Sequence, residues 1–450
     1  MNLDYFKRKS KSHILAKVDT LGMYDFYNST IYLGSISPEH IEAISASAAG
    51  PIKNQGGAGL SFDQYSLLSK IFPLVIHECT HFIDATSTLW GLGHLQKMSL
   101  AYTSSGLYGG KEEDFIFAKS FHTHVRSLRL PEYYTLVDST IERVTQWRRP
   151  EITGGIVFSS DGRISDKPIL FARFSSRDGA FLARSPISMV SLLEASAMAQ
   201  EIFSKLSLIG RLDEDQGAIE AAVFSTKTIE YLYNQEITEY SVCVHLVGNH
   251  INCEDVAFSF YLTAALVRVA LNFPHRAFDK VLESCDLEKL FWPVEQKFIK
   301  RLQDGLRIQD PCILFFILCH ALAKDIDHSA EKVKEEIVNA LSILGVEEVE
   351  LKTWIAEDAK YLSEEIFSRK SESVSLLGRV GMKNIDRIDI IGSYLKWHEL
   401  ELPPIFLADL TSWSPFASST NEFSKINFDN FFEEMMHGER WVNNFAEGCL

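Results

Sequence analysis

The segment Leu74–Asp84 constrains this chain more than any other, because it contains the pattern His-Glu-x-x-His at positions 77–81. On an α-helix, residues four apart lie on one face, with their Cβ atoms about 6 Å apart. His77 and His81 can therefore offer imidazole nitrogens to a single metal ion. Glu78 then lies beside the ion, where its carboxylate can take a proton from a metal-bound water.

The residues around this pattern indicate a buried helix rather than a solvent-facing cluster of histidine and glutamate. A charged residue at such positions would lose its hydration without gaining a partner. The positions before, inside and after the pattern are all uncharged: Leu74, Val75, Ile76, Cys79, Thr80, Phe82 and Ile83.

This segment resembles the active-site helix of the zincin metallopeptidases, which carry His-Glu-x-x-His between uncharged neighbours. The resemblance implies that His77 and His81 bind Zn²⁺ and that Glu78 is the general base. Metzincins place a glycine three residues after the second histidine and a third histidine six residues after it. Here these positions hold Asp84 and Ser87, so the third ligand must come from elsewhere in the chain.

Glu194 is the predicted third metal ligand, on a helix that we expect to open at Ser185-Pro186 and to include Met189–Phe203. Leu192, Leu193 and Met198 make the surroundings of Glu194 apolar, so its carboxylate needs a partner. Small side chains beside it would let this helix approach the first one closely, as a bridging metal ion requires: Ala195, Ser196, Ala197 and Ala199.

The pattern Glu194-x-x-Ala197 resembles the downstream ligand segment of the gluzincins, among them the ImmA/IrrE-type bacterial metallopeptidases, although it matches no single gluzincin family. Asp84 has two further interpretations, as an acceptor that orients the His81 imidazole or as an exposed helical residue. Four other carboxylates stay open as the third ligand: Glu201, Glu112, Glu113 and Asp84.

Composition narrows the class of protein. The net charge of −16 argues against binding to nucleic acid or to anionic membranes. Seven cysteines without a Cys-x-x-Cys pair, and no apolar core in Met1–Lys17, predict a reduced cytoplasmic protein. Val256–Phe273 is interrupted by Arg268 and Cys312–Ala323 is short, so both are expected to be buried helices rather than membrane spans.

The helix that carries the histidines is expected to cover residues 62–90. Ser61 is its predicted N-cap, and Pro73 should kink or restart it. Gly91 and Gly93 are expected to end it. A loop rich in alanine, glycine and serine is predicted before it, over residues 46–61.

Short strands are expected at Ser29–Leu33 and in two hairpins, the first pairing residues 155–159 with 163–164 and the second 169–175 with 180–184. The resemblance implies that the small antiparallel sheet within residues 153–184 holds an extended substrate beside the metal. Residues 122 and 124, both histidine, are interpreted as ordinary polar residues, and a helix is expected to end at 148–150.

The predicted fold class is α+β, with a zincin-like part over residues 1–210, a helical domain over 211–400 and an aromatic-rich C-terminal segment, 401–450, that packs on the body. From residue 215 the chain is expected to be almost entirely helical. The predicted helices cover residues 216–234, 236–247, 254–272, 276–304, 311–324, 328–344, 347–369 and 384–399.

These features predict a zinc-dependent metallopeptidase of narrow specificity that acts on a protein or peptide, with a possible regulatory protein partner. Tyr231, Tyr240 and His245 are the candidates for stabilising the oxyanion. The alternative is a non-enzymatic helical interaction protein whose metal site is structural or vestigial, closed by a fourth ligand such as His94. A third interpretation is a hydrolase of the same fold that acts on a substrate other than a peptide.

Overall fold

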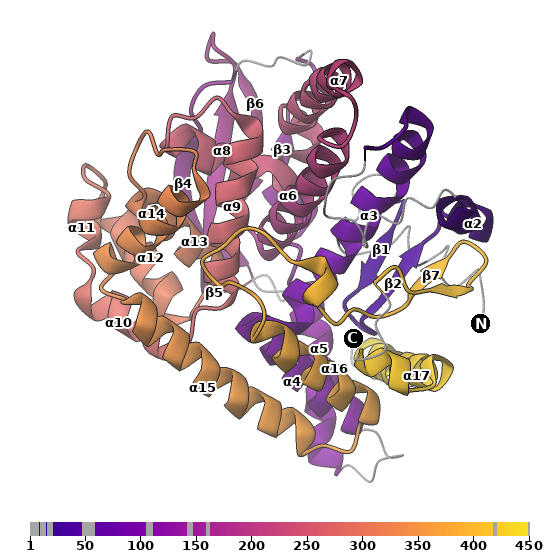
Figure 1. The fold of residues 1–450 in the computed structure, drawn as a ribbon. Coiled ribbons are helices and arrows are strands. Elements are labelled where there is room, and N and C mark those ends of the chain that lie inside the picture. The colour runs from indigo at the N-terminus through magenta and orange to yellow at the C-terminus, as the bar shows by residue number, and fades with distance from the viewer. Residues whose placement is uncertain are drawn as a thin grey trace.

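The fold is known from a computed structural model, which describes residues 9, 15, 21–46, 59–104, 111–141, 147–158, 163–416 and 421–448. It mixes many helices with two small four-stranded sheets, and the predicted α+β class is confirmed at this level (Figure 1). The loop predicted at residues 46–61 lies mostly outside the described residues, as does the turn at 159–162.

The first sheet joins the two ends of the chain. Its order is β1 (Met23–Asp25), β2 (Thr30–Leu33), β7 (Ile405–Leu407) and β8 (Ser412–Trp413). The predicted strand at Ser29–Leu33 is confirmed as β2, which pairs in parallel with β7 and antiparallel with β1. The C-terminal segment therefore does more than pack on the body, because it supplies half of this sheet.

The second sheet is antiparallel, with the order β3 (Leu136–Val137), β6 (Phe181–Pro186), β5 (Ile164–Ser175) and β4 (Glu151–Phe158). Both predicted hairpins are confirmed, and they share the single long strand β5. A helix ending at 148–150 is wrong for the described residues, since Trp147 forms a β-bridge instead.

The other regular elements of the described chain are helices. The short 3₁₀ helices are Glu112–Phe115, Glu132–Tyr134, Gln235–Ile237, Trp397–Glu399 and Glu422–Lys425. The α-helices are α2 (Pro38–Ala46), α3 (Phe62–Thr86), α4 (Leu89–Thr103), α5 (Ile116–Arg126), α6 (Met189–Ile209), α7 (Glu214–Leu232), α8 (Thr238–His250), α9 (Val256–Leu271), α10 (His275–Ser284), α11 (Leu287–Leu290), α12 (Gln296–Arg307), α13 (Pro311–Ala321), α14 (Ala330–Ile343), α15 (Glu348–Phe367), α16 (Glu372–Ile385) and α17 (Phe428–Gly448).

Two predicted helices in the C-terminal region are wrong. The one expected at 276–304 is broken into α10, α11 and α12, with Pro293 between the last two, because proline removes a backbone donor and clashes with the preceding turn. The one expected at 384–399 overlaps only the end of α16 and the short 3₁₀ helix Trp397–Glu399, and the chain between them contains no helix. The mostly helical character of this region is confirmed.

A large hydrophobic core contains residues from all three predicted segments, from Leu15 through helices α3, α6 and α9 to Val442 in α17. The segment boundaries at 210 and 400 stay predictions. No single described helix is long and apolar enough to cross a membrane. Helices α9 and α10 meet these two criteria only when taken together, and the angle between them is 104°.

Candidate metal centre

Helix α3 carries His77, Glu78 and His81, and its start follows the sequence closely. The Ser61 hydroxyl accepts a hydrogen bond from the Gln64 backbone N–H at 3.3 Å, and the Gln64 side chain accepts one from the Ser61 N–H at 3.0 Å. This reciprocal capping satisfies two donors that a helix start leaves open. The helix then continues through Pro73 to the turns that carry His77 and His81.

The end of α3 differs from the prediction of a helix over residues 62–90. The helix ends at Thr86, and Thr88 caps a new helix, α4, by accepting a hydrogen bond from the Gly91 N–H at 2.9 Å. Gly91 lies inside α4, where a Cβ would stand 2.6 Å from the carbonyl carbon of Ala85. This glycine therefore permits a close contact between two helices, and it does not terminate one.

Helix α6 lies against α3 and brings Glu194 to the histidines (Figure 1). Its predicted opening at Ser185-Pro186 is wrong, because Pro186 ends strand β6 and Ser188 is the N-cap of α6. The small residues expected at the contact are buried, with Ala195 and Ala199 fully so. Close packing of the two helices through small side chains is thus confirmed.

His77, His81 and Glu194 converge with the spacing of ligands around one ion. The two histidine Nε2 atoms are 3.3 Å apart, and the Glu194 carboxylate oxygens lie 3.5 Å from His77 Nε2 and 3.8 Å from His81 Nε2. Two tetrahedral ligands at about 2.0–2.1 Å from zinc are about 3.3–3.4 Å apart. Among the described residues this is the group of three whose donor atoms could hold a metal ion.

Glu201 occupies the far side of His77 instead of the ligand position. Its carboxylate lies 2.9 Å from His77 Nδ1, so Nδ1–H donates to it and the Nε2 lone pair faces Glu194 and His81. Glu201 was an alternative third ligand in the sequence. In the structure its carboxylate instead orients the His77 ring. Its place seven residues after Glu194, on the same helix face, is a signal that could have predicted this.

The charge balance of the site favours a cation. Burial opposes protonation of His77, yet the carboxylates of Glu194 and Glu201 raise the pKa of this imidazole well above its usual value. A divalent ion would satisfy the same two carboxylates in place of the proton. The His77 side chain remains 14% exposed and that of Glu201 33% exposed, so solvent reaches this side of the group.

The Glu78 side chain lies against the first sheet and interacts electrostatically with His77, Glu194 and Glu201. Its side chain packs on Gly22, where a Cβ would stand 2.8 Å from the carboxylate, and it interacts with the backbone of Tyr24 in β1. Burial raises the Glu78 pKa to about 7, His77 opposes this, and the carboxylates of Glu194 and Glu201 add to it. The sheet next to helix α3 is thus the first one, through strand β1. The strands β5 and β6 of the second sheet, which was expected to lie beside the metal, pack on α12 and α8.

The remaining candidate ligands do not join the group. Asp84 is buried, so the exposed alternative is wrong, and it forms a hydrogen bond with Ser196 near the Arg268 guanidinium. Glu112 is exposed in a short 3₁₀ helix and stands outside the three-residue group. The side chain of Glu113 lies outside the part of the chain that the structure describes.

His94 is not the fourth ligand. Its Nε2 donates to the Phe26 carbonyl at 2.9 Å, so Nδ1 must be the acceptor, and His124 Nε2 donates to it at 3.2 Å. Burial lowers the pKa of His94 to about 3 and that of His124 well below its usual value. Residue 124 is therefore half-buried and hydrogen-bonded to a buried histidine, which corrects its interpretation as an ordinary polar residue.

The three oxyanion candidates are separated by their surroundings. His245 donates through Nε2 to the Leu232 carbonyl at 2.8 Å and stacks on Trp147, so this N–H already has a partner. The Tyr240 hydroxyl contacts Leu15 and accepts a hydrogen bond from Arg129. Tyr231, on α7, is the third candidate. Burial raises the pKa of its hydroxyl, and the carboxylates of Glu194 and Glu201 add to this effect.

Comparison of this chain with protein-family models, with curated proteins and with solved structures gives no match. The arrangement of side chains around His77, His81 and Glu194 is therefore the basis on which a function can be argued.

Proposed function

We propose that this protein is a zinc-dependent metallopeptidase, with a zincin-like active site formed by α3 and α6. The observation that carries the proposal is the convergence of His77 Nε2, His81 Nε2 and the Glu194 carboxylate, at separations of 3.3, 3.5 and 3.8 Å. Two histidines and one glutamate are a frequent ligand set of catalytic zinc. Bound there, Zn²⁺ would supply an acidified water and a Lewis acid for the scissile carbonyl.

Three side chains of this chain would bind the ion and one would orient a ligand. His77 and His81 present Nε2, and Glu194 completes a set of three that leaves a fourth tetrahedral position for solvent or substrate. Glu201 holds the His77 ring through Nδ1 and fixes its tautomer. This contact also makes the imidazole a better electron-pair donor.

Glu78 would move the proton. A base acts best when its pKa lies near the working pH, and burial brings the Glu78 carboxyl to about 7. A divalent cation at the three ligands would lower this value, since positive charge favours the carboxylate. Glu78 would therefore accept a proton at neutral pH and return it to the leaving amine. Tyr231 is our candidate for stabilising the oxyanion, because it interacts electrostatically with both Glu194 and Glu201, whereas the Tyr240 hydroxyl is hydrogen-bonded to Leu15 and Arg129.

The alternative, an interaction protein with a structural metal, requires a closed site. Structural zinc sites use four protein ligands, whereas catalytic sites keep one position open. Among the described residues three donors converge, and His94, the expected fourth, hydrogen-bonds the Phe26 carbonyl instead. This difference favours the enzymatic proposal over the structural one.

The decisive experiment measures metal and activity on the same preparations. Wild-type protein, Glu194→Ala and Glu78→Gln are purified without chelator, their zinc is quantified by plasma mass spectrometry, and each is assayed on a peptide library. We expect about one zinc per chain in wild type and Glu78→Gln, little in Glu194→Ala, and cleavage by wild type alone. Zinc in all three would exclude Glu194 as a ligand. Zinc without any cleavage would favour the structural alternative.

A further inference from the structure

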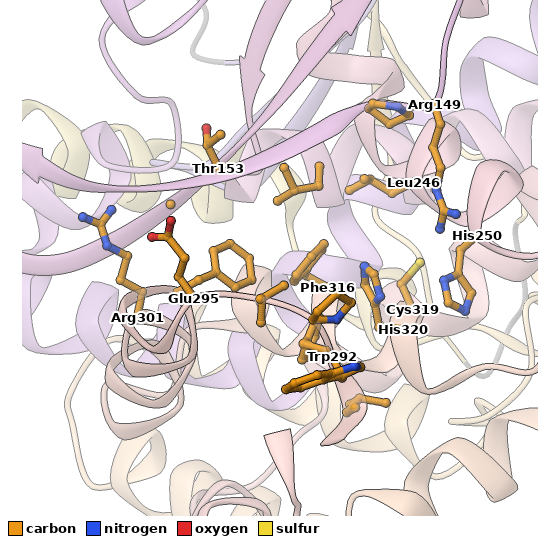
Figure 2. Close-up of a pocket in the computed structure, with 18 of the residues that line it drawn as sticks. Arg149, Thr153, Leu246, His250, Trp292, Glu295, Arg301, Phe316, Cys319 and His320 are labelled. Carbon is orange, nitrogen blue, oxygen red and sulfur yellow. The ribbon is translucent and has the colours of Figure 1, made fainter. Parts of the chain in front are cut away.

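A cavity of 730 Å³ lies in the helical region, and none of its lining residues belongs to the metal centre. Strand β4 and helices α8, α11, α12 and α13 contribute its walls (Figure 2). Pockets that bind small molecules usually have volumes of about 300–1,000 Å³ and combine apolar walls with a few polar groups. The volume of this cavity therefore suits a small organic molecule.

The middle of the cavity is aromatic. Phe316 is 1% exposed and stacks on Phe291, with ring centroids 5.4 Å apart and an interplanar angle of 20°. Trp292 lines the same cavity and is 81% exposed, so its ring is open to a ligand. A ligand with an apolar body would cover the Trp292 ring and remove this exposure.

One end of the cavity is polar and cationic. Figure 2 shows Arg149, His250 and His320 gathered there, on the side away from Arg301. His250 donates through Nε2 to the Leu322 carbonyl at 3.0 Å. For His320 and Arg149 we find no hydrogen bond or ion pair among the described residues, so both can serve a ligand.

His320 is a neutral donor in this setting. Burial, His250 and the Arg149 charge together lower the His320 pKa to about 3. A neutral imidazole keeps one N–H, which can join a guanidinium in binding a carboxylate. Arg149 and His320 thus form the kind of pair that recognises an anionic group.

The opposite end of the cavity carries side chains of both charges. Glu295 lies there with Arg301 (Figure 2), and Lys297 also lines the cavity. The Arg301 side chain packs on Gly154 in β4, where a Cβ would stand 2.7 Å from its Cδ. Three cations face one carboxylate in this cavity, although the whole chain has a net charge of −16. The cavity is therefore a cationic exception on an acidic protein.

We propose that this cavity binds a small organic carboxylate with an apolar body, with the carboxylate at Arg149 and His320 and the body against Phe316 and Trp292. The site is independent of the metal centre, so its ligand is not the peptidase substrate. A failed test of the zinc site leaves this proposal standing, and the reverse also holds.

The test uses dodecanoate as the ligand, below its micelle concentration, and 8-anilinonaphthalene-1-sulfonate as a fluorescent competitor. We expect dodecanoate to displace the competitor, and dodecyltrimethylammonium, with the same chain but a positive head group, to fail. Dodecanoate should also change the tryptophan fluorescence of wild type, and Trp292→Phe should lose that change while it still binds. Equal competition by the cationic chain, or a dodecanoate-induced fluorescence change in Trp292→Phe as large as that of wild type, would overturn the proposal.

Arg149→Ala and Arg148→Ala form a matched pair of variants. Arg149 lines the cavity, whereas its neighbour donates to the Arg177 carbonyl outside it. Loss of a charge-assisted hydrogen bond should weaken dodecanoate binding about tenfold or more in Arg149→Ala and leave Arg148→Ala near wild type. Both side chains are exposed, so folding should survive, and thermal unfolding checks it. Equal affinity in the two variants, or no dodecanoate binding to wild type, would refute the assignment.

Discussion

Two pairs of histidines in this molecule have nearly the same geometry and opposite chemistry. The Nε2 atoms of His77 and His81 are 3.3 Å apart, and His124 Nε2 lies 3.2 Å from His94 Nδ1. Carboxylates of α6 surround the first pair, whereas the second contacts the Phe26 carbonyl and aromatic rings. The pKa of His77 is accordingly raised and that of His94 lowered. The partners, rather than the nitrogen spacing, distinguish a candidate metal site from a hydrogen-bonded pair.

The largest expected difference between the two pairs is in metal content. His81→Ala should lose nearly all zinc, because it leaves two ligands, whereas His124→Gln should keep about one zinc per chain. Plasma mass spectrometry on proteins purified in parallel measures both. Zinc retained by His81→Ala, or lost equally by His124→Gln, would remove the distinction between the pairs.

The next effect concerns catalysis at the first pair. Glu78→Gln should reduce peptide hydrolysis by about 10²–10⁴-fold, because an amide cannot accept the proton, while zinc content stays that of wild type. Steady-state cleavage of the best library peptide gives the ratio. Glu112→Gln is the control, since Glu112 is exposed and does not belong to the group of His77, His81 and Glu194. Full turnover by Glu78→Gln would refute the general-base assignment.

Glu201 tests whether the carboxylate on Nδ1 matters to the first pair. Glu201→Gln should weaken zinc binding about 10–100-fold, since loss of an orienting carboxylate typically has this effect on a metal site. Competition with a chromogenic chelator measures the dissociation constant. Glu230→Gln, on the exposed face of α7, should bind zinc like wild type. An unchanged affinity in Glu201→Gln would show that His77 needs no such support.

The neutral His94 of the second pair should make the free energy of unfolding depend on pH. His94 has a folded pKa of about 3, below its unfolded value of about 6.5, so the unfolded state binds more protons between these values. Stability from this residue is therefore present above pH 6.5 and is lost as pH falls, by about 2 kcal/mol at pH 5. Denaturant unfolding of wild type and His94→Gln at pH 7.5 and 5 compares the two slopes. Equal slopes would mean that His94 is not buried as a neutral ring.

The parts of the site that a local pattern encodes could be predicted from the sequence. His77, Glu78 and His81 share one helical turn, and the small residues after Glu194 indicated the helix that packs on them. The pair of His94 and His124 could not be predicted, because these residues lie on different helices whose contact depends on the tertiary fold. Spacing along one helix is visible in a sequence, whereas a contact between helices is not.

The same limit applies to the fold. Strand β2 was predicted from its own residues, but its parallel pairing with Ile405–Leu407 joins segments at opposite ends of the chain. The end of α3 was predicted wrongly because Gly91 and Gly93 were interpreted as terminators. Both lie inside α4, and Thr88 supplies the cap that starts it. A glycine that allows close packing and one that ends a helix look alike in a sequence.

These two glycines give the smallest expected effect and connect the two histidine pairs, since α4 carries His94 and packs on the helix of His81. A Cβ at Gly91 would stand 2.6 Å from Ala85, whereas one at Gly93 meets nothing within 4 Å. Gly91→Ala should therefore destabilise the protein by about 1–3 kcal/mol, and Gly93→Ala should stabilise it by up to about 1 kcal/mol through helix propensity. Denaturant unfolding measures both. If Gly91→Ala and Gly93→Ala changed the free energy of unfolding equally, the contact between α3 and α4 would tolerate a methyl group. The position of α4, which carries His94, relative to the helix of His81 would then not require a glycine at residue 91.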